Sequence, residues 1–164
     1  MKTDRIEKQI VLRAPRERVW AAIVDSKKFG HWFGVEFEGP FVEGQKVSGK
    51  IVPTRVDEKV AGMQKPYEGM PCDFFVEKIE PMQRFSYRWY PYALEPGADY
   101  SKEPTTLIVF ELRDVDGGTL LKITESGFDA VPLARRAEAF KSNEQGWEMQ
   151  TKLIAKYLAA NANA

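Results

Sequence analysis

Hydrophobic and polar residues alternate in several segments of the chain, and this pattern predicts β-strands. In the segment 6–12, Ile6, Ile10 and Leu12 share one parity, as on a strand with one buried face. The other predicted strands are 35–41, 45–52, 72–80, 84–90, 105–114 and 119–126. A turn joins 35–41 to 45–52 through "VEGQ", and the Asp-Gly pair in "DVDGG" predicts a tight turn between the last two strands. The middle of the chain is therefore expected to form an antiparallel meander.

Helical spacing appears at both ends of the chain. Near the start, Val19, Trp20 and Ile23 share one helical face after Pro15, and a further short turn is expected before Gly34 ends the helical region. Near the end, Pro132 is expected to open a long helix that runs to about Ala160. The segment "SNEQ" at 142–145 resembles a capping box that restarts or continues this helix.

The last helix carries a wide apolar arc that also contains small and polar residues. Its apolar members are Trp147, Met149, Leu153, Ile154, Tyr157 and Leu158. Asn143, Gly146 and Gln150 fall within the same arc, although buried amides need hydrogen-bond partners. This pattern has two interpretations: the rim of a helix with close backbone packing, or a helix face that partly lines a space.

A carboxylate shares the inward parity of a predicted strand. Leu121, Ile123 and Glu125 lie on one parity, as do Phe85, Tyr87 and Trp89 on another strand. If Leu121 and Ile123 point inward, so does Glu125, and its carboxylate must be paired, solvated by a cavity or protonated. The alternative is an edge position where the strand leaves the sheet just before Gly127.

These elements predict a single α+β domain over residues 1–164, with one long helix packed on a curved antiparallel sheet. Two long loops interrupt the meander, at 53–70 and 91–104. Long loops in compact domains often serve as lids, and we consider this role for 53–70. Tyr90, Tyr92 and Tyr100 are candidates for a dimer surface, and the expected state is a monomer or a homodimer.

The composition excludes several classes of function. The 24 basic and 24 acidic residues balance, so nothing in the charge favours nucleic acid or an anionic membrane as a partner. No segment is apolar enough for membrane insertion or for a signal peptide. Cys72 is the sole cysteine and His31 the sole histidine, which makes a zinc site improbable and agrees with a cytoplasmic location. We expect no metal and no cofactor.

The stretch "KFGHWFG" gathers Phe29, Trp32 and Phe33 around His31, between two glycines. One interpretation is an anchor in the hydrophobic core. The other is the mouth of a binding cavity, closed by Trp32 and Phe33. For His31, exposure beside Trp32 is the simpler expectation, and a polar contact at the mouth is the alternative.

Five ordered motifs resemble those of the family of activators of heat-shock protein 90 ATPase. They are "VLRAPRERVWAAI", "HWF", "IEPMQRFSYRWYP", "TLLKITESGF" and "GWEMQTKLIAKYL", and together they span about 6–158. That family belongs to the START-like, helix-grip (SRPBCC) superfamily. The resemblance implies a curved antiparallel sheet that grips the long terminal helix, with two short helices near the N-terminus and a mostly apolar cavity between sheet and helix.

The resemblance also implies which residues contact a ligand. The positions that match cavity-facing ones are Trp32, Phe33, Tyr87, Trp89, Ile123, Glu125, Phe128, Gly146, Trp147 and Gln150. Many relatives have a histidine near the position of Glu125, so the polar contact inside the cavity is expected to differ here.

Three functions are considered on the basis of these residues and this resemblance. The first is binding of a small apolar or amphipathic molecule, in a role related to stress. The second is an interaction with a chaperone, as the family name implies. The third is catalysis of the cyclase or hydrolase type, with Glu125, Tyr87 and His31 as candidate acid–base groups. No nucleophile elbow, phosphate loop or dinucleotide motif supports catalysis, so we predict no catalytic residues.

Overall fold

A computed structural model describes residues 4–93, 95 and 97–161. Its main feature is an antiparallel sheet of six strands in the order β1-β8-β7-β6-β5-β3. These strands are β1 (Arg5–Leu12), β3 (Lys46–Val47), β5 (Phe74–Glu80), β6 (Arg84–Trp89), β7 (Thr106–Val115) and β8 (Gly118–Ser126). The predicted α+β class and antiparallel meander are confirmed.

The register of the sheet places the alternating apolar residues of its strands on the face that is buried. Val115 pairs with Gly118, so Asp116 and Gly117 form the two-residue turn that the sequence predicts. Ile108 lies opposite Glu125, and both side chains are fully buried. The strand β1 pairs along its whole length with β8, which brings the start of the chain beside the last strand.

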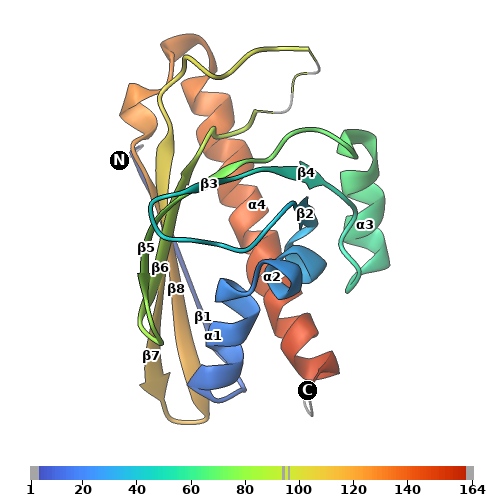
Figure 1. Cartoon of the computed structure of the whole chain (residues 1–164), viewed down its shortest axis with the longest axis vertical. Coiled ribbons are helices and arrows are strands. Elements are labelled where there is room, and N and C mark those ends of the chain that lie inside the picture. Colours follow the sequence, from blue (N-terminus) through green and yellow to red (C-terminus); the bar gives the residue numbers. More distant parts are fainter. Residues whose placement is uncertain (1–3, 94, 96, 162–164) are drawn as a thin grey trace.

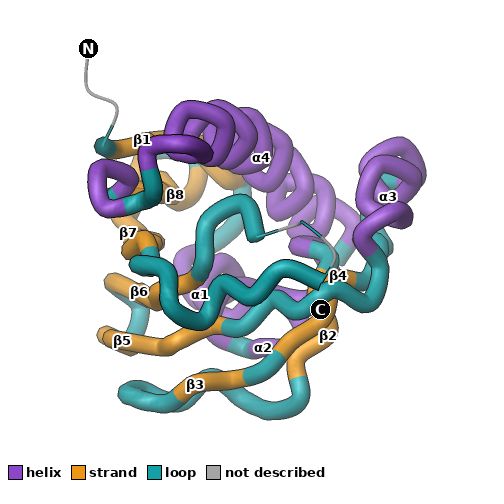
Figure 2. The backbone as a smooth tube through the Cα atoms, turned by 90° about the horizontal axis from the view of Figure 1, so that it is seen from above, coloured by secondary structure: helices purple, strands orange, loops and turns teal. Residues whose placement is uncertain are grey.

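The helix α4 (Leu133–Ala160) lies across one face of the sheet, and the helices α1 (Arg16–Val24) and α2 (Ser26–Phe33) pack beside it toward its C-terminal end (Figure 1). The view from above shows the sheet curving beneath α4 (Figure 2). The helix α4 is unbroken, so "SNEQ" continues the helix and does not restart it. Together these elements form the helix-grip arrangement that the family resemblance implies.

Local chemistry explains where α2 begins and ends. The Asp25 side chain accepts hydrogen bonds from the backbone N–H groups of Lys27 and Lys28, which caps the helix. Gly34 ends the helix in the left-handed region, with φ of 99°, and donates its N–H to the carbonyl of Gly30. The predicted end of the helical region at Gly34 is confirmed.

The segment between β2 and β5 is more ordered than the sequence predicts. The strands β2 (Val35–Phe37) and β4 (Gly49–Ile51) are shorter than expected and pair in a small second sheet. The expected irregular loop at 53–70 contains the helix α3 (Glu58–Gln64) and the 3₁₀ turn η1 (Lys65–Tyr67). Asp57 caps α3 by accepting from the N–H of Val60, and an aspartate before a short helical segment is the local signal for this helix start.

Aromatic side chains fill the core below α2. Phe74 and Tyr87 stack in parallel with ring centroids 3.8 Å apart, and Phe29 packs edge-on against both. Trp32 is fully buried, and its indole N–H donates to the carbonyl of Ala22 at 2.9 Å. The aromatic residues of the stretch "KFGHWFG" therefore serve mainly to anchor α2 in the hydrophobic core.

Candidate functional site

The carboxylate of Glu125 is buried at the centre of the molecule and accepts hydrogen bonds from four side chains. Trp147 and Asn143 of α4 donate to it from one side, at 2.8 Å and 3.0 Å. Trp89 of β6 and Thr106 at the start of β7 donate from the sheet, at 2.8 Å and 2.6 Å. Of the three states considered for an inward carboxylate, the structure shows the paired one.

Burial raises the pKa of the Glu125 carboxyl, because removal of hydration disfavours the charge, and the four hydrogen bonds offset part of this rise. The two indole N–H groups and the Asn143 amide N–H can only donate, so the ionised carboxylate is the form that satisfies every partner. The network links the sheet to α4 through the side chain of Glu125.

A cavity of about 1000 Å³ opens beside this network, on the side of α4 that faces α3. Its walls come from the end of α2, the β4–α3–η1 segment, the β6 end of the sheet, the 91–104 loop and α4. Apolar and aromatic side chains make up much of the wall: Phe33, Ile51, Met63, Tyr67, Phe75, Trp89, Tyr90, Tyr92, Tyr100 and Met149. Met63 and Tyr67 stay exposed at its edge.

Three of the residues predicted to contact a ligand line this cavity: Phe33, Trp89 and Gln150. The others lie outside its wall. Trp32, Tyr87, Ile123, Glu125, Phe128 and Trp147 are buried in the core, and Gly146 is partly exposed on α4. A Cβ added at Gly146 would meet no atom within 4 Å, so this glycine makes no dent in a packed wall.

The tyrosines proposed for a dimer surface belong to the cavity wall. Tyr90 donates its hydroxyl to the carbonyl of Ser101, and Tyr92 donates to Glu138 on α4. The Tyr100 ring lies 5.0 Å from the Arg135 guanidinium carbon, a cation–π contact. Sequence reasoning missed the loop tyrosines, Met63 and Tyr67 as cavity residues, because loops and very short helices carry no periodicity that reveals which side chains turn inward. The periodicity of the last helix does place Asn143 and Met149 in its apolar arc, and both line the cavity.

Two amides from different elements meet at the carbonyl of Phe33, the last residue of α2. Gln150 of α4 donates to it at 3.0 Å, and Gln64 of α3 donates at 3.1 Å. A helix leaves its final carbonyls without intrahelical partners, so this oxygen needs donors from elsewhere. The side-chain oxygen of Gln64 accepts from the N–H of Thr54 at 2.7 Å, which ties α3 into the cavity wall.

Cys72 lines the cavity, and its thiol offers a test of the local environment. Burial raises its pKa to about 12, and the Asp73 carboxylate adds to the rise. We expect alkylation by iodoacetamide at pH 8 to be on the order of a hundredfold slower than for an unstructured cysteine, because so little thiolate is present. The rate measured on the denatured chain is the control, and equal rates in both states would contradict this environment.

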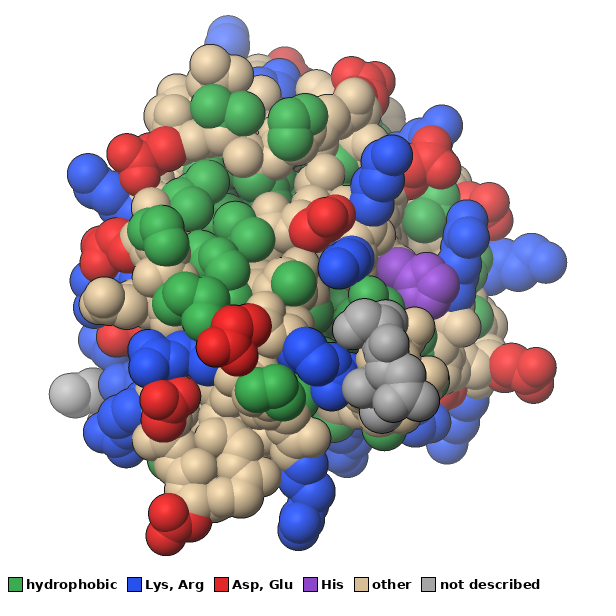
Figure 3. Space-filling view, turned by 60° about the horizontal axis from the view of Figure 1, so that its bottom comes forward, with side chains coloured by type: hydrophobic (Ala, Val, Ile, Leu, Met, Phe, Trp, Pro, Cys, Tyr) green, Lys and Arg blue, Asp and Glu red, His purple; other side chains and the backbone are tan. Residues whose placement is uncertain are grey.

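His31 lies outside the cavity wall. It is half-buried, its ring lies 5.6 Å from that of Tyr157, and partial burial and the nearby Arg55 lower its pKa. The surface view shows the histidine in purple beside blue lysine and arginine side chains (Figure 3). The structure gives no support to a polar contact of His31 at the cavity mouth.

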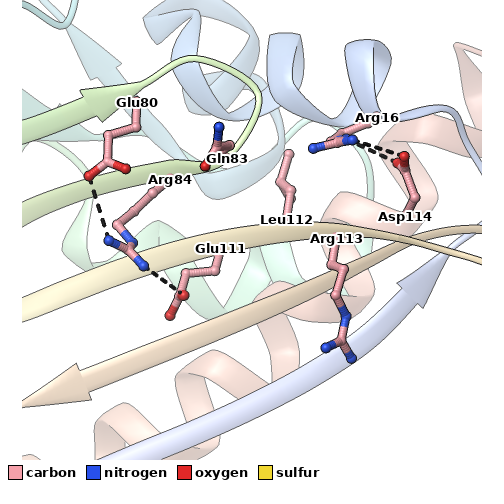
Figure 4. A pocket seen from close by; sticks show the side chains of 8 residues that line it. All are labelled: Arg16, Glu80, Gln83, Arg84, Glu111, Leu112, Arg113 and Asp114. Atoms are coloured by element: carbon pink, nitrogen blue, oxygen red, sulfur yellow. Dashed lines mark hydrogen bonds and ion pairs between the residues drawn. The ribbon is translucent and has the colours of Figure 1, made fainter.

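A second hollow, of about 390 Å³, lies at the far end of the sheet and is lined mainly by charged side chains (Figure 4). Arg16 forms two hydrogen bonds with the carboxylate of Asp114, and Arg84 pairs with Glu80 and Glu111. Arg16 and Arg84 are neutralised by the carboxylates beside them, and Arg113 points away from the other labelled side chains (Figure 4), so the hollow has little to offer a charged ligand.

The described residues contain no group of three or more histidine, cysteine, aspartate or glutamate side chains placed to hold a metal ion. Nor does any helix among them combine the length and apolar character needed to cross a membrane.

Comparison with known structures supports the fold. A protein from Arthrobacter aurescens solved by NMR superposes with a TM-score of 0.73 at 17% identity, over 98% of this chain and 89% of its own. The solution structure of the Aha1 dimer from Colwellia psychrerythraea gives a TM-score of 0.63 at 18% identity, with 94% and 95% covered. At such identities the likeness concerns the fold alone.

A further neighbour is DynU16, a protein of the dynemicin biosynthetic locus, with a TM-score of 0.66 at 20% identity. The match covers 95% of this chain but only 47% of DynU16, so the present chain spans about half of that protein. No curated protein matches the chain in sequence.

The family model described as "Activator of Hsp90 ATPase homolog 1-like protein" matches residues 13–159. This range contains every strand of the large sheet except β1, the helices α1 to α3, nearly all of α4 and the cavity wall. The resemblance noted from the sequence motifs is thereby confirmed. The chain belongs to the family of Activator of Hsp90 ATPase homolog 1-like proteins.

Proposed function

We propose that this protein binds a small, mostly apolar molecule with one polar end in the cavity between α4, α3 and the sheet. The observation that carries the proposal is the combination of aromatic and methionine walls with a buried amide oxygen, that of Gln150, which has no partner among the described residues. Known ligand sites share this composition: mostly apolar walls with a few placed polar groups.

The volume also supports a small-molecule ligand. Ligand pockets in proteins usually measure about 300–1000 Å³, and this cavity lies at the upper end of that range. Met63 and Tyr67 expose apolar surface at the cavity edge, which a bound molecule would cover. We infer that the α3–η1 segment acts as the lid considered for residues 53–70.

The first test is native mass spectrometry of gently purified protein, followed by a thermal-shift screen with compounds extracted from it. At a ligand concentration of about 100 times Kd, we expect the melting temperature to rise by about 5–10 °C, because binding stabilises only the folded state. Absence of any bound molecule, together with no shift from cell extracts, would contradict the proposal.

A matched pair of variants ties this result to the cavity. Met149→Trp adds an indole to the cavity wall of α4 and is expected to abolish the shift. Lys152→Trp adds the same group on the exposed face of α4 and is expected to leave the shift unchanged. An equal loss in both variants would show that the effect comes from the helix and not from the cavity.

The geometry supports neither of the two other functions considered, and for catalysis it gives a direct reason. Glu125, Tyr87 and His31, the candidate acid–base groups, all lie outside the cavity wall, and the four donors around Glu125 occupy its carboxylate. For an interaction with a chaperone, the family name is the sole support. Ligand binding in the cytoplasm therefore remains our proposal.

A further inference from the structure

The polar groups that face the cavity from α4 are oriented so that their oxygens remain free. Gln150 is 8% exposed, and its side-chain N–H group donates to the carbonyl of Phe33. A carbonyl oxygen can only accept, so the amide cannot be turned around. The side-chain oxygen of Gln150 is therefore left buried without a hydrogen bond among the described residues.

Asn143 repeats this arrangement seven residues earlier, which is about two turns along the same face of α4. Its side-chain N–H group lies 3.0 Å from each oxygen of the Glu125 carboxylate. Because a carboxylate accepts and does not donate, this amide is also fixed in one orientation. Its remaining polar atom is the side-chain oxygen, for which the described residues supply no donor.

Several side-chain donors of the cavity wall are, in contrast, committed to protein partners. The indole N–H of Trp89 is held by Glu125, and one amide N–H of Gln64 by the Phe33 carbonyl. The hydroxyls of Tyr90 and Tyr92 donate to Ser101 and Glu138. Around Glu125 and the Phe33 carbonyl, the wall thus offers acceptors to a ligand more readily than donors.

The charge of the cavity wall also disfavours an anionic ligand. Among the described residues that line the cavity, the acidic side chains are Glu68, Asp73, Glu95 and Asp99, and the one cationic side chain is Lys46. The Lys46 ammonium lies 3.5 Å from the Asp73 carboxylate and is partly neutralised by it. An anionic ligand would meet both repulsion from this wall and unpaired carbonyl oxygens inside it.

We propose that the ligand carries hydrogen-bond donors at its polar end, as an alcohol or a protonated amine does, and that the cavity selects against the corresponding carboxylate. This inference rests on the proposed function, since it concerns the same cavity. A donor group of the ligand supplies the missing partner of the Gln150 oxygen, and an empty or mismatched site leaves that oxygen unpaired at a cost.

The test compares phenylbutylamine, phenylbutanol and phenylbutanoic acid by calorimetric titration near neutral pH. The three compounds share one apolar body and differ only in the polar end. We expect the amine and the alcohol to bind at least about tenfold more tightly than the acid. Equal or tighter binding of the acid would overturn the donor preference while leaving the proposed function intact. Failure of all three to bind would count against both.

A matched pair of variants assigns the preference to one atom. Gln150→Met keeps the length of the side chain, removes the oxygen and is expected to reduce the preference to less than about threefold. Gln145→Met makes the same change on the exposed side of α4 and is expected to keep the full preference. Gln150→Met is expected to fold, because Gln64 still donates to the Phe33 carbonyl.

Asn143→Ala provides a second route if Gln150→Met does not fold. It removes the other free oxygen, while Trp89, Thr106 and Trp147 continue to donate to Glu125. We expect a smaller preference for the alcohol over the acid in this variant. An unchanged preference in both variants would show that hydrogen bonds to these oxygens do not determine which polar end the cavity binds.

Discussion

Replacing Glu125 with leucine is expected to lower the free energy of unfolding by about 3–5 kcal/mol, a loss typical of removing one partner from a buried charged network. The change removes the acceptor of hydrogen bonds from four side chains at the junction of sheet and helix. Each donor left buried without a partner costs about 1–3 kcal/mol. Urea denaturation followed by far-UV circular dichroism measures the difference.

Glu111→Leu is the control for this experiment. Glu111 is also a glutamate on the large sheet, but its partner is the half-exposed Arg84, at 3.2 Å. Exposed pairs of this kind contribute about 0–1 kcal/mol, so the control is expected to stay close to the wild type. Similar losses in the two variants would contradict the central role that we assign to Glu125.

Gly30→Ala is expected to destabilise the protein by about 3 kcal/mol, which is the loss that overpacking of a tight contact produces. Gly30 lies within α2, where the helix packs closely against the start of β2. A Cβ built on Gly30 would lie 2.0 Å from the backbone carbonyl oxygen of Val35. Backbone cannot move aside as a flexible side chain does, so α2 and β2 must separate. Thermal and urea denaturation measure the loss.

Gly146→Ala is the matched comparison, since it makes the same substitution within α4. A Cβ at Gly146 meets nothing within 4 Å. Alanine is the better helix former, so this variant is expected to be more stable by about 0.5–1 kcal/mol. Opposite signs for the two substitutions are the expected result, and a stabilised Gly30→Ala protein would contradict the close packing of α2 on β2.

Most of the fold could be predicted from the sequence because its signals are local. Alternation of apolar residues located β1 and the strands from β5 to β8, and turn residues fixed their connections. The 3.6-residue period located α4, and Gly34 marked the end of α2. The main failure was 53–70, where α3 is too short and too polar for its periodicity to be noticed.

The site was less predictable than the fold for a physical reason. Strand parity placed Ile123 and Glu125 on one face, and the family resemblance implied that this face and Tyr87 point inward, but parity cannot distinguish a side chain that fills the core from one that faces a cavity. The amide residues Asn143 and Gln150 were recognised as unusual in an apolar arc. Their partners, Glu125 and the Phe33 carbonyl, become visible only when α4 is packed on the sheet.

The sequence by itself determined the α+β class, the order of the elements and the position of a carboxylate on the same strand face as Leu121 and Ile123. These properties depend on neighbours along the chain, which periodicity and turn chemistry record. The tertiary structure alone decided that four donors hold Glu125, that Gly30 tolerates no side chain while Gly146 does, and that loop tyrosines line the cavity. Each of these outcomes depends on contacts between residues far apart in the sequence, and such contacts leave no local pattern.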